Sequence, residues 1–200
     1  MRIAAGLVLA SFLLAFSLSI TGWFERFSAA TLFGMGGFLS ASGFLILHWL
    51  SEKFRIFVRA RSIRRLTLGQ TLRFFGLLAL VKAYQHVLPA LFAVPTGLID
   101  VAFAGTSFFV AARLVRADGT ARPGFIAWHF LGLLGLAVSV VLAILTSSTR
   151  FGLVTADHTS QPMTWFPMSL VPVFIGPMVL IFHLLAIAVA LEHRKVDGSR

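Results

Sequence analysis

The chain has 200 residues, of which 58% are hydrophobic and 12% are charged, and its formal net charge is +10. Soluble domains are about 45–50% hydrophobic and about 25% charged, so this composition argues against a soluble protein and predicts an integral membrane one. The chain has no cysteine, which excludes disulfides, thiolate metal sites and cysteine nucleophiles.

Six apolar segments are each long enough to cross the roughly 30 Å hydrocarbon core of a bilayer. They lie near residues 3–23, 29–50, 71–92, 95–115, 125–146 and 167–191. The first follows Arg2 in the manner of a signal peptide, but its apolar run continues to Ile20 without a convincing cleavage site, so we interpret it as a retained helix. The sequence therefore predicts an all-α, polytopic transmembrane helical bundle of about six helices, forming a single domain over residues 1–200.

The basic residues predict the orientation of these helices. Fourteen of the 17 lysines and arginines lie near the two ends of the chain or in the connections after the second and fourth helices, whereas Arg26 and Arg150 lie in the opposite connections. Because Lys and Arg flanking membrane spans stay on the cytoplasmic side, we expect both termini to be cytoplasmic. The net charge is then an orientation signal, and we expect no binding to nucleic acid.

The connection after the second helix, residues 51–73, mixes aromatic and basic residues. It predicts a short amphipathic cytoplasmic helix on the anionic lipids of the inner leaflet; a docking surface for an acidic partner is the alternative. A capping box at residues 67–70 predicts the start of the third helix. The residues expected to contact lipid head groups are Lys53, Arg55, Arg59, Arg61, Arg64 and Arg65.

Small residues and prolines mark two other helices. Gly36 and Ser40, four residues apart in the second helix, predict close helix packing. Pro172, Gly176 and Pro177 predict a kink or break in the outer half of the sixth helix, because proline removes a hydrogen-bond donor. A break that lines a binding site, as in many transporters, is the functional alternative to a plain kink.

Four polar residues interrupt the third and fourth helices: Lys82, Gln85, His86 and Asp100. Lys82 and His86 are four apart and share one helix face. A turn centred near Ala93 would place Asp100 level with His86 and one turn from Lys82. Since an unpaired charge at mid-span costs about 2.5–3.5 kcal/mol, we expect a Lys82–His86–Asp100 cluster with Gln85 beside it. Such a cluster would either hold the two helices together or form a polar pocket.

Three other histidines are candidate haem ligands: His48, His129 and His183. His129 with His183, or His48 with His129, would lie at similar depth, so a bis-histidine haem is permitted. The sequence has no H-E-x-x-H motif and no acid near these histidines, so no metal site is expected. It also has no paired carboxylates and no nucleophile–base arrangement, which argues against an enzyme.

Residues 54–187 resemble a widespread family of uncharacterised bacterial multi-span membrane proteins. The resemblance is carried by LTLGQTLRFFG, LPALFAVPTGLID, WHFLGLLGLAVSV and FPMSLVPVFIGPMVLIFHLLAI. The family pattern has Asn and Asp where this chain has His129 and Gly135, and Gly where it has Ile99. The resemblance implies a bacterial cytoplasmic (inner) membrane location and no established activity, and chemistry that used the family's Asp would be missing here.

The sequence leaves three kinds of function open. The first is binding or translocation of a small solute or ion through Lys82, His86 and Asp100. The second is a b-type haem or quinone redox protein, and the third is a non-catalytic accessory or assembly subunit. The expected partners are the bilayer and its anionic lipids, while a small-molecule ligand and a homo-oligomer stay open.

Overall fold

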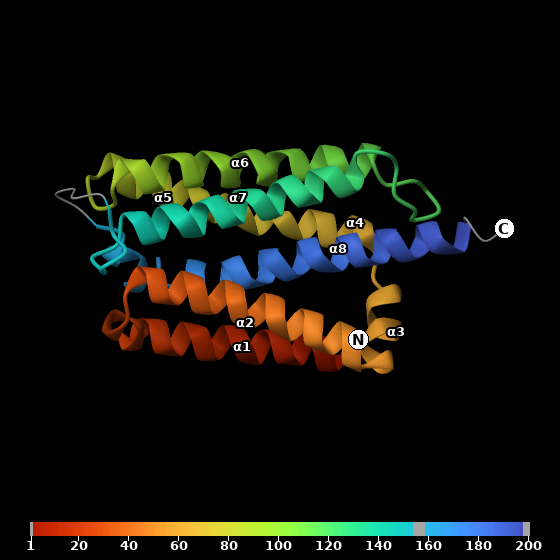
Figure 1. The fold of residues 1–200 in the computed structure, drawn as a ribbon, viewed down its shortest axis with the longest axis horizontal. Coiled ribbons are helices and arrows are strands. Elements are labelled where there is room, and N and C mark those ends of the chain that lie inside the picture. The colour runs from red at the N-terminus through yellow and green to blue at the C-terminus, as the bar shows by residue number, and fades with distance from the viewer. Residues whose placement is uncertain (1, 154–158, 198–200) are drawn as a thin grey trace.

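A computed structural model describes residues 2–153 and 159–197, and the side chains of residues 6–153 and 159–193. Arg2, Arg194, Lys195 and Arg200, which contribute to the charge pattern, have side chains outside this part of the chain. The described residues are helical apart from connecting segments and one isolated bridge between Val115 and Ala121. The long helices run along a common axis (Figure 1).

The elements follow one another along the chain with short connections. In order they are α1 (Arg2–Ile20), η1 (Trp23–Arg26), α2 (Ala29–Leu50), α3 (Glu52–Arg59), α4 (Ile63–Leu68), η2 (Gly69–Phe75), α5 (Gly76–Tyr84), α6 (Ala90–Arg113), α7 (Phe125–Leu145), η3 (Gln161–Thr164), η4 (Val171–Ile175) and α8 (Gly176–Asp197). Of these, η1, η2 and η3 are 3-10 helices and η4 is a π-helical turn.

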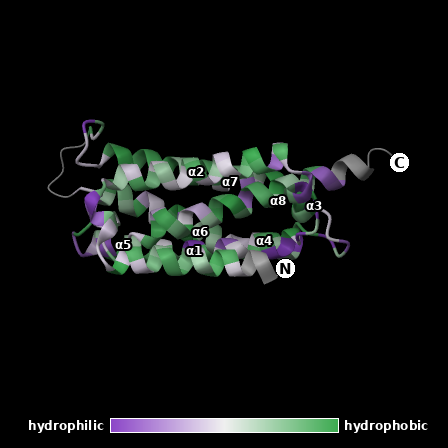
Figure 2. Cartoon of the chain, turned by 90° about the horizontal axis from the view of Figure 1, so that it is seen from below, coloured by the Kyte–Doolittle hydropathy of each residue, from purple (hydrophilic) through white to green (hydrophobic). Residues whose placement is uncertain are grey.

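Five helical stretches are long and apolar enough to cross a membrane: Ala29–Leu50, Ile63–Tyr84, Ala90–Arg113, Phe125–Leu145 and Val171–His193. The apolar part of α1, Gly6–Ile20, is shorter. Hydrophobic residues cover the length of the bundle and hydrophilic ones gather at its two ends (Figure 2). The chain is therefore a multi-span membrane protein.

The helix of the third span begins at Ile63, whereas the sequence predicted a start near residue 71. The prediction placed Arg64 and Arg65 in the connection before this helix, because two successive charges are typical of a connection. Both arginines are exposed, however, while Ile63 on the other side of the helix is buried. The elements α4, η2 and α5 continue as one span, which carries Arg73 into the middle of the bundle.

The turn between the third and fourth spans also differs from the prediction. Helix α5 ends at Tyr84 and α6 begins at Ala90, so the turn is centred near residue 87 and not near Ala93. In two antiparallel helices, moving the centre of the turn by six residues moves the expected partner of a given residue by twelve. Asp100 therefore lies level with the region of Arg73 and not with His86.

Two glycines bring these antiparallel helices close together. A Cβ atom on Gly76 of α5 would lie 2.5 Å from the Cβ of Asp100, and one on Gly97 of α6 would lie 2.8 Å from the Gly76 carbonyl oxygen. Neither position has room for a side chain, so the absence of a Cβ sets the distance between α5 and α6.

Helix α2 makes a similar close contact with η4. A Cβ on Gly36 would lie 2.2 Å from the carbonyl oxygen of Pro172, and Ser40 Oγ donates to the Gly36 carbonyl at 2.6 Å. Pro177 has no N–H, so the backbone cannot close the usual α-helical bond at that position, and the preceding Val171–Ile175 segment is π-helical. The irregular segment thus packs against α2 where α2 has no side chain.

Candidate functional site

The most prominent polar feature of the bundle is a buried ion pair between Arg73 of η2 and Asp100 of α6. Arg73 Nε donates to Asp100 Oδ1 at 2.8 Å, and Arg73 Nη2 lies 2.8 Å from the same oxygen. Side-chain exposure is 1% for Arg73 and 14% for Asp100. Both residues lie near the middle of their spans, where an unpaired charge would cost about 2.5–3.5 kcal/mol, so each charge requires the other.

The other side of the guanidinium is held by α7 and α8. Arg73 Nη1 lies 3.3 Å from the Gly132 carbonyl oxygen, to which it donates, and 3.3 Å from His183 Nε2. The guanidinium carbon also lies 4.6 Å from the centre of the Phe103 ring, a cation–π contact. Four elements, η2, α6, α7 and α8, therefore fix the position of this one side chain.

Two buried histidines extend the hydrogen bonding away from the ion pair. His183 Nδ1 and His129 Nδ1 are 2.8 Å apart, and His129 Nε2 lies 3.3 Å from Thr67 Oγ1. Thr67 Oγ1 donates to the Ile63 carbonyl at 2.7 Å. We call the resulting set, Asp100, Arg73, His183, His129 and Thr67, the polar chain.

The donors and acceptors of the polar chain determine its proton positions. Arginine can only donate, so His183 Nε2 accepts from Arg73 and the single proton of a neutral His183 is on Nδ1. That proton is donated to His129 Nδ1, which leaves the His129 proton on Nε2, where Thr67 Oγ1 accepts it. Each bond then has one donor and one acceptor, with both histidines neutral.

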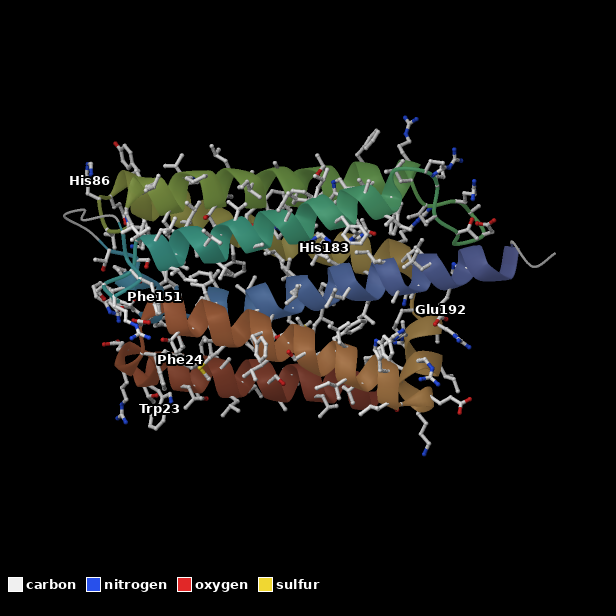
Figure 3. All side chains as sticks on the ribbon, viewed as in Figure 1. Trp23, Phe24, His86, Phe151, His183 and Glu192 are labelled. Carbon is white, nitrogen blue, oxygen red and sulfur yellow. The ribbon has the colours of Figure 1, made fainter. Side chains whose placement is uncertain are left out.

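A missing side chain on α7 makes room for the histidine pair. A Cβ atom on Gly132 would lie 2.2 Å from His183 Cε1, so only glycine fits there. His183 points into the interior of the bundle in Figure 3, whereas His86 lies at its end. The pair lies beside the aromatic rings of Phe125 and Trp128, with ring centres 4.6 Å and 4.9 Å from that of His129.

The ion pair lies on the wall of a cavity of about 250 Å³. The cavity is lined by residues of α2, η2, α5, α6, α7, η4 and α8, and most of them are apolar. Its polar side chains in the described part of the chain are Arg73, Thr96, Asp100 and Ser139. Ser139 donates to the Gly135 carbonyl at 3.0 Å, but Thr96 Oγ1 and Arg73 Nη2 are buried without a well-aligned hydrogen-bond partner.

The predicted Lys82–His86–Asp100 cluster does not form. Lys82 Nζ donates to Gln85 Oε1 at 2.9 Å, and His86 is exposed in the α5–α6 connection, where its φ is 56°. Asp100 pairs with Arg73, which the sequence analysis had placed in the connection before the third helix. The prediction was wrong because the turn is centred near residue 87 and not near Ala93. None of Lys82, Gln85 and His86 lines the cavity.

Of the three histidines predicted as haem ligands, two form a buried pair and the third lies elsewhere. His129 and His183 are in direct contact, with ring centres 4.9 Å apart. Two axial ligands must stand on opposite faces of a porphyrin with the iron between them, so this pair as arranged does not fit a haem. His48 stacks on Phe44 near the end of α2, with ring centres 5.8 Å apart.

The basic residues expected to bind lipid head groups also contact the protein. Arg55 Nη1 donates to the last carbonyls of α2, Arg59 pairs with Glu192, and Arg61 stacks on Phe57. Arg64 Nη2 donates to a carbonyl of the α6–α7 connection at 3.5 Å. Lys53 and Arg65 are exposed, and lipid binding by any of the six remains a prediction.

Pro172, Gly176 and Pro177, where the sequence predicted a kink or break, all line the cavity. At this point the structure has the π-helical turn Val171–Ile175 followed by α8. The irregular segment therefore forms part of the wall of the same cavity.

Sequence reasoning missed Arg73 and Thr67. A usable signal was present, because Thr67, Gln70 and Arg73 recur every three residues and all three are buried. That spacing is typical of one helix face, but it is visible only once the helix is known to begin at Ile63. Gln70 Nε2 donates to the Val179 carbonyl at 3.3 Å, which connects the same face to α8.

The bundle and its buried polar chain define the class as a multi-span membrane protein. Residues 30–191 match the family described as a domain of unknown function, DUF8737. Since the match covers most of the chain, the protein belongs to this family. The comparisons with curated proteins and with solved structures find no match.

Proposed function

We propose that this protein binds a small solute inside the membrane, in the cavity beside Arg73 and Asp100, as a carrier or as the binding step of translocation. In this proposal it crosses a bacterial cytoplasmic membrane six times, with both termini in the cytoplasm. In addition to the five long helical stretches, α1 would also cross the membrane, because its 19 residues would extend about 28 Å.

The arrangement of the ends supports this topology. The first residues of α1, the last turns of α8 and the basic helix α3 lie at the same end of the bundle (Figure 1). Helix α1 packs on the segment around η4, with the Phe12 and Phe174 rings 5.2 Å apart. Arg73, which was predicted in the cytoplasmic connection, lies in the middle of a span. Most of the other basic residues still lie in the segments predicted to be cytoplasmic.

The observation that carries the binding proposal is an incompletely satisfied ion pair on a cavity wall. An ion pair that served only to hold two helices together would stabilise them most with a full set of hydrogen bonds, which offset the cost of burying its charges. Here Arg73 Nη2 and the neighbouring Thr96 Oγ1 lack well-aligned partners, and both residues line the cavity. Polar residues within membrane spans generally mark ligand sites or transport pathways.

Two glycines of α2 provide a matched test. A Cβ atom on Gly37 or Gly43 would meet nothing within 4 Å, but only Gly37 lines the cavity. We expect a small molecule to co-purify with the wild type and Gly43→Leu, and to be lost from Gly37→Leu, when organic extracts of the purified proteins are compared by mass spectrometry. Identical extracts from all three proteins would contradict the proposal.

A quinone is a second candidate, favoured by the largely apolar lining of the cavity. A quinone is neutral and largely apolar, so it would bring no uncompensated charge to the middle of the membrane. Oxidised-minus-reduced ultraviolet spectra of the same organic extracts would reveal it, and a spectrum without quinone absorbance would eliminate it. Contact with anionic lipids, self-association and an accessory role remain predictions from the sequence.

A further inference from the structure

We infer that the ligand of this cavity is a neutral lipophile whose polar group is a hydroxyl, a lipophilic alcohol or phenol. This inference rests on the proposed binding function and adds the chemical class of the ligand. It follows from three properties of the cavity wall: its free hydrogen-bond acceptor, its net charge and its apolar remainder.

The form of the ion pair decides which of its atoms is available to a ligand. Arginine and aspartate often pair through two nitrogens and two oxygens, but here Nε and Nη2 of Arg73 both approach Oδ1 of Asp100. Within the described residues no hydrogen bond reaches Asp100 Oδ2, and Arg73 Nη2 has no aligned acceptor. Arg73 Nη2 is itself buried, so the atom that the ion pair leaves free on the wall is the acceptor Oδ2.

The free acceptor belongs to the more accessible partner of the pair, since the side chain of Asp100 is 14% exposed and that of Arg73 is 1% exposed. Oδ2 belongs to the same carboxylate as Oδ1, which lies 2.8 Å from Nη2. Thr96, one turn before Asp100 on the same helix, adds a buried hydroxyl without a partner. The polar part of the site is thus compact and lies at one place on the wall.

The net charge of the wall excludes charged ligands. Arg73 and Asp100 cancel, and they are the charged side chains that line the cavity in the described part of the chain. The histidines behind Arg73 are neutral in the proton arrangement of the polar chain. An added cation or anion would therefore bring an uncompensated charge to the middle of the membrane.

A hydroxyl is the simplest neutral group that satisfies this free acceptor. It can donate to Asp100 Oδ2, whereas an ether or ketone can only accept. The rest of the ligand must be apolar, because it would contact Phe33, Leu136 and Val140 among other hydrophobic side chains.

Four probes of equal chain length test the class. They are 8-fluorooctan-1-ol, its methyl ether, 8-fluorooctylamine and 8-fluorooctanoate, each titrated by fluorine NMR into nanodiscs that hold the protein, with empty nanodiscs as the reference. We expect the alcohol to give a protein-bound signal that Gly43→Leu keeps and Gly37→Leu loses. The other three probes should bind roughly tenfold more weakly or worse, since each leaves a buried polar atom or charge unpaired.

A charge-changing variant tests the same inference. Asp100→Asn leaves Arg73 as the one charge of the wall, so we expect preference to move from the alcohol to the octanoate. If this variant does not fold, the comparison of the four probes on the wild type and on Gly37→Leu still decides the class.

The outcomes separate the two proposals. If all four probes bind equally and Gly37→Leu abolishes them all, the cavity is a binding site but the hydroxyl class is wrong. The class is also wrong if no probe binds while the extracts still contain a species that Gly37→Leu removes. If neither the probes nor the extracts respond to Gly37→Leu, both proposals fail.

Discussion

Arg73 and Asp100, which are 27 residues apart in the chain, meet at one carboxylate oxygen in the middle of the bundle. They meet because a short turn makes α5 and α6 antiparallel and because Gly76 and Gly97 let these helices approach closely. From this pair the polar chain continues through His183 and His129 to Thr67. A single line of hydrogen bonds thus connects the cavity with the first turns of α4.

Removing one partner of the ion pair should destabilise the protein strongly. Asp100→Ala leaves the Arg73 charge buried and unpaired, so we expect a loss of about 3–5 kcal/mol in the free energy of unfolding. The double change Arg73→Met with Asp100→Leu removes both charges and should recover most of that loss. Unfolding measured in detergent micelles checks this, and a double variant no more stable than the single one would contradict it.

The proton positions of the polar chain can be observed directly. We expect His129 to carry its proton on Nε2 and His183 on Nδ1 at neutral pH, because Arg73 can only donate and Thr67 uses its own proton on a carbonyl. Nitrogen-15 NMR of labelled histidine side chains distinguishes the two tautomers. The opposite tautomers, or a doubly protonated ring, would refute the assigned chain.

Two glycine substitutions should differ sharply in their effect. Gly132→Ala places a Cβ 2.2 Å from the His183 ring and must displace it, so we expect a loss of about 1–3 kcal/mol in stability. Gly105→Ala on α6 meets nothing within 4 Å and should be neutral or slightly stabilising, since alanine favours helix. Thermal unfolding of both variants makes the comparison, and equal losses would show that the His183 contact does not matter.

The residues at the tip of the α5–α6 hairpin should be dispensable for cavity binding. Lys82→Met and His86→Ala change side chains that do not line the cavity, so we expect each to alter stability by no more than about 0.5 kcal/mol. The bound small molecule should be unaffected. Loss of that molecule from either variant would contradict this expectation and support the predicted role of Lys82 and His86 in binding.

The topology can be mapped with single cysteines, because the chain has none of its own. We expect a membrane-impermeant maleimide applied to intact cells to label Thr21→Cys and Ser148→Cys but not Ala117→Cys. All three positions are exposed at the ends of the bundle. Labelling of Ala117→Cys from outside would contradict the six-span arrangement with cytoplasmic termini.

The sequence by itself determined the class of the protein and much of its helical structure. Hydropathy and length are local properties, and they were sufficient to identify the five long apolar helices and the short helix α3. They also drew attention to Asp100, His129 and His183, because polar residues are rare in apolar spans. The same local criteria misplaced the start of the third helix, since Arg64 and Arg65 resemble a connection.

Only the tertiary structure decided which polar residues meet. The partner of Asp100 depends on the position of a turn, and a turn centred near residue 87 replaces His86 and Lys82 with Arg73. The meeting of His129 with His183 depends on the contact of α7 with α8 and on the space that Gly132 leaves. Such contacts are set by helix register and packing between distant segments, which hydropathy along one chain does not encode.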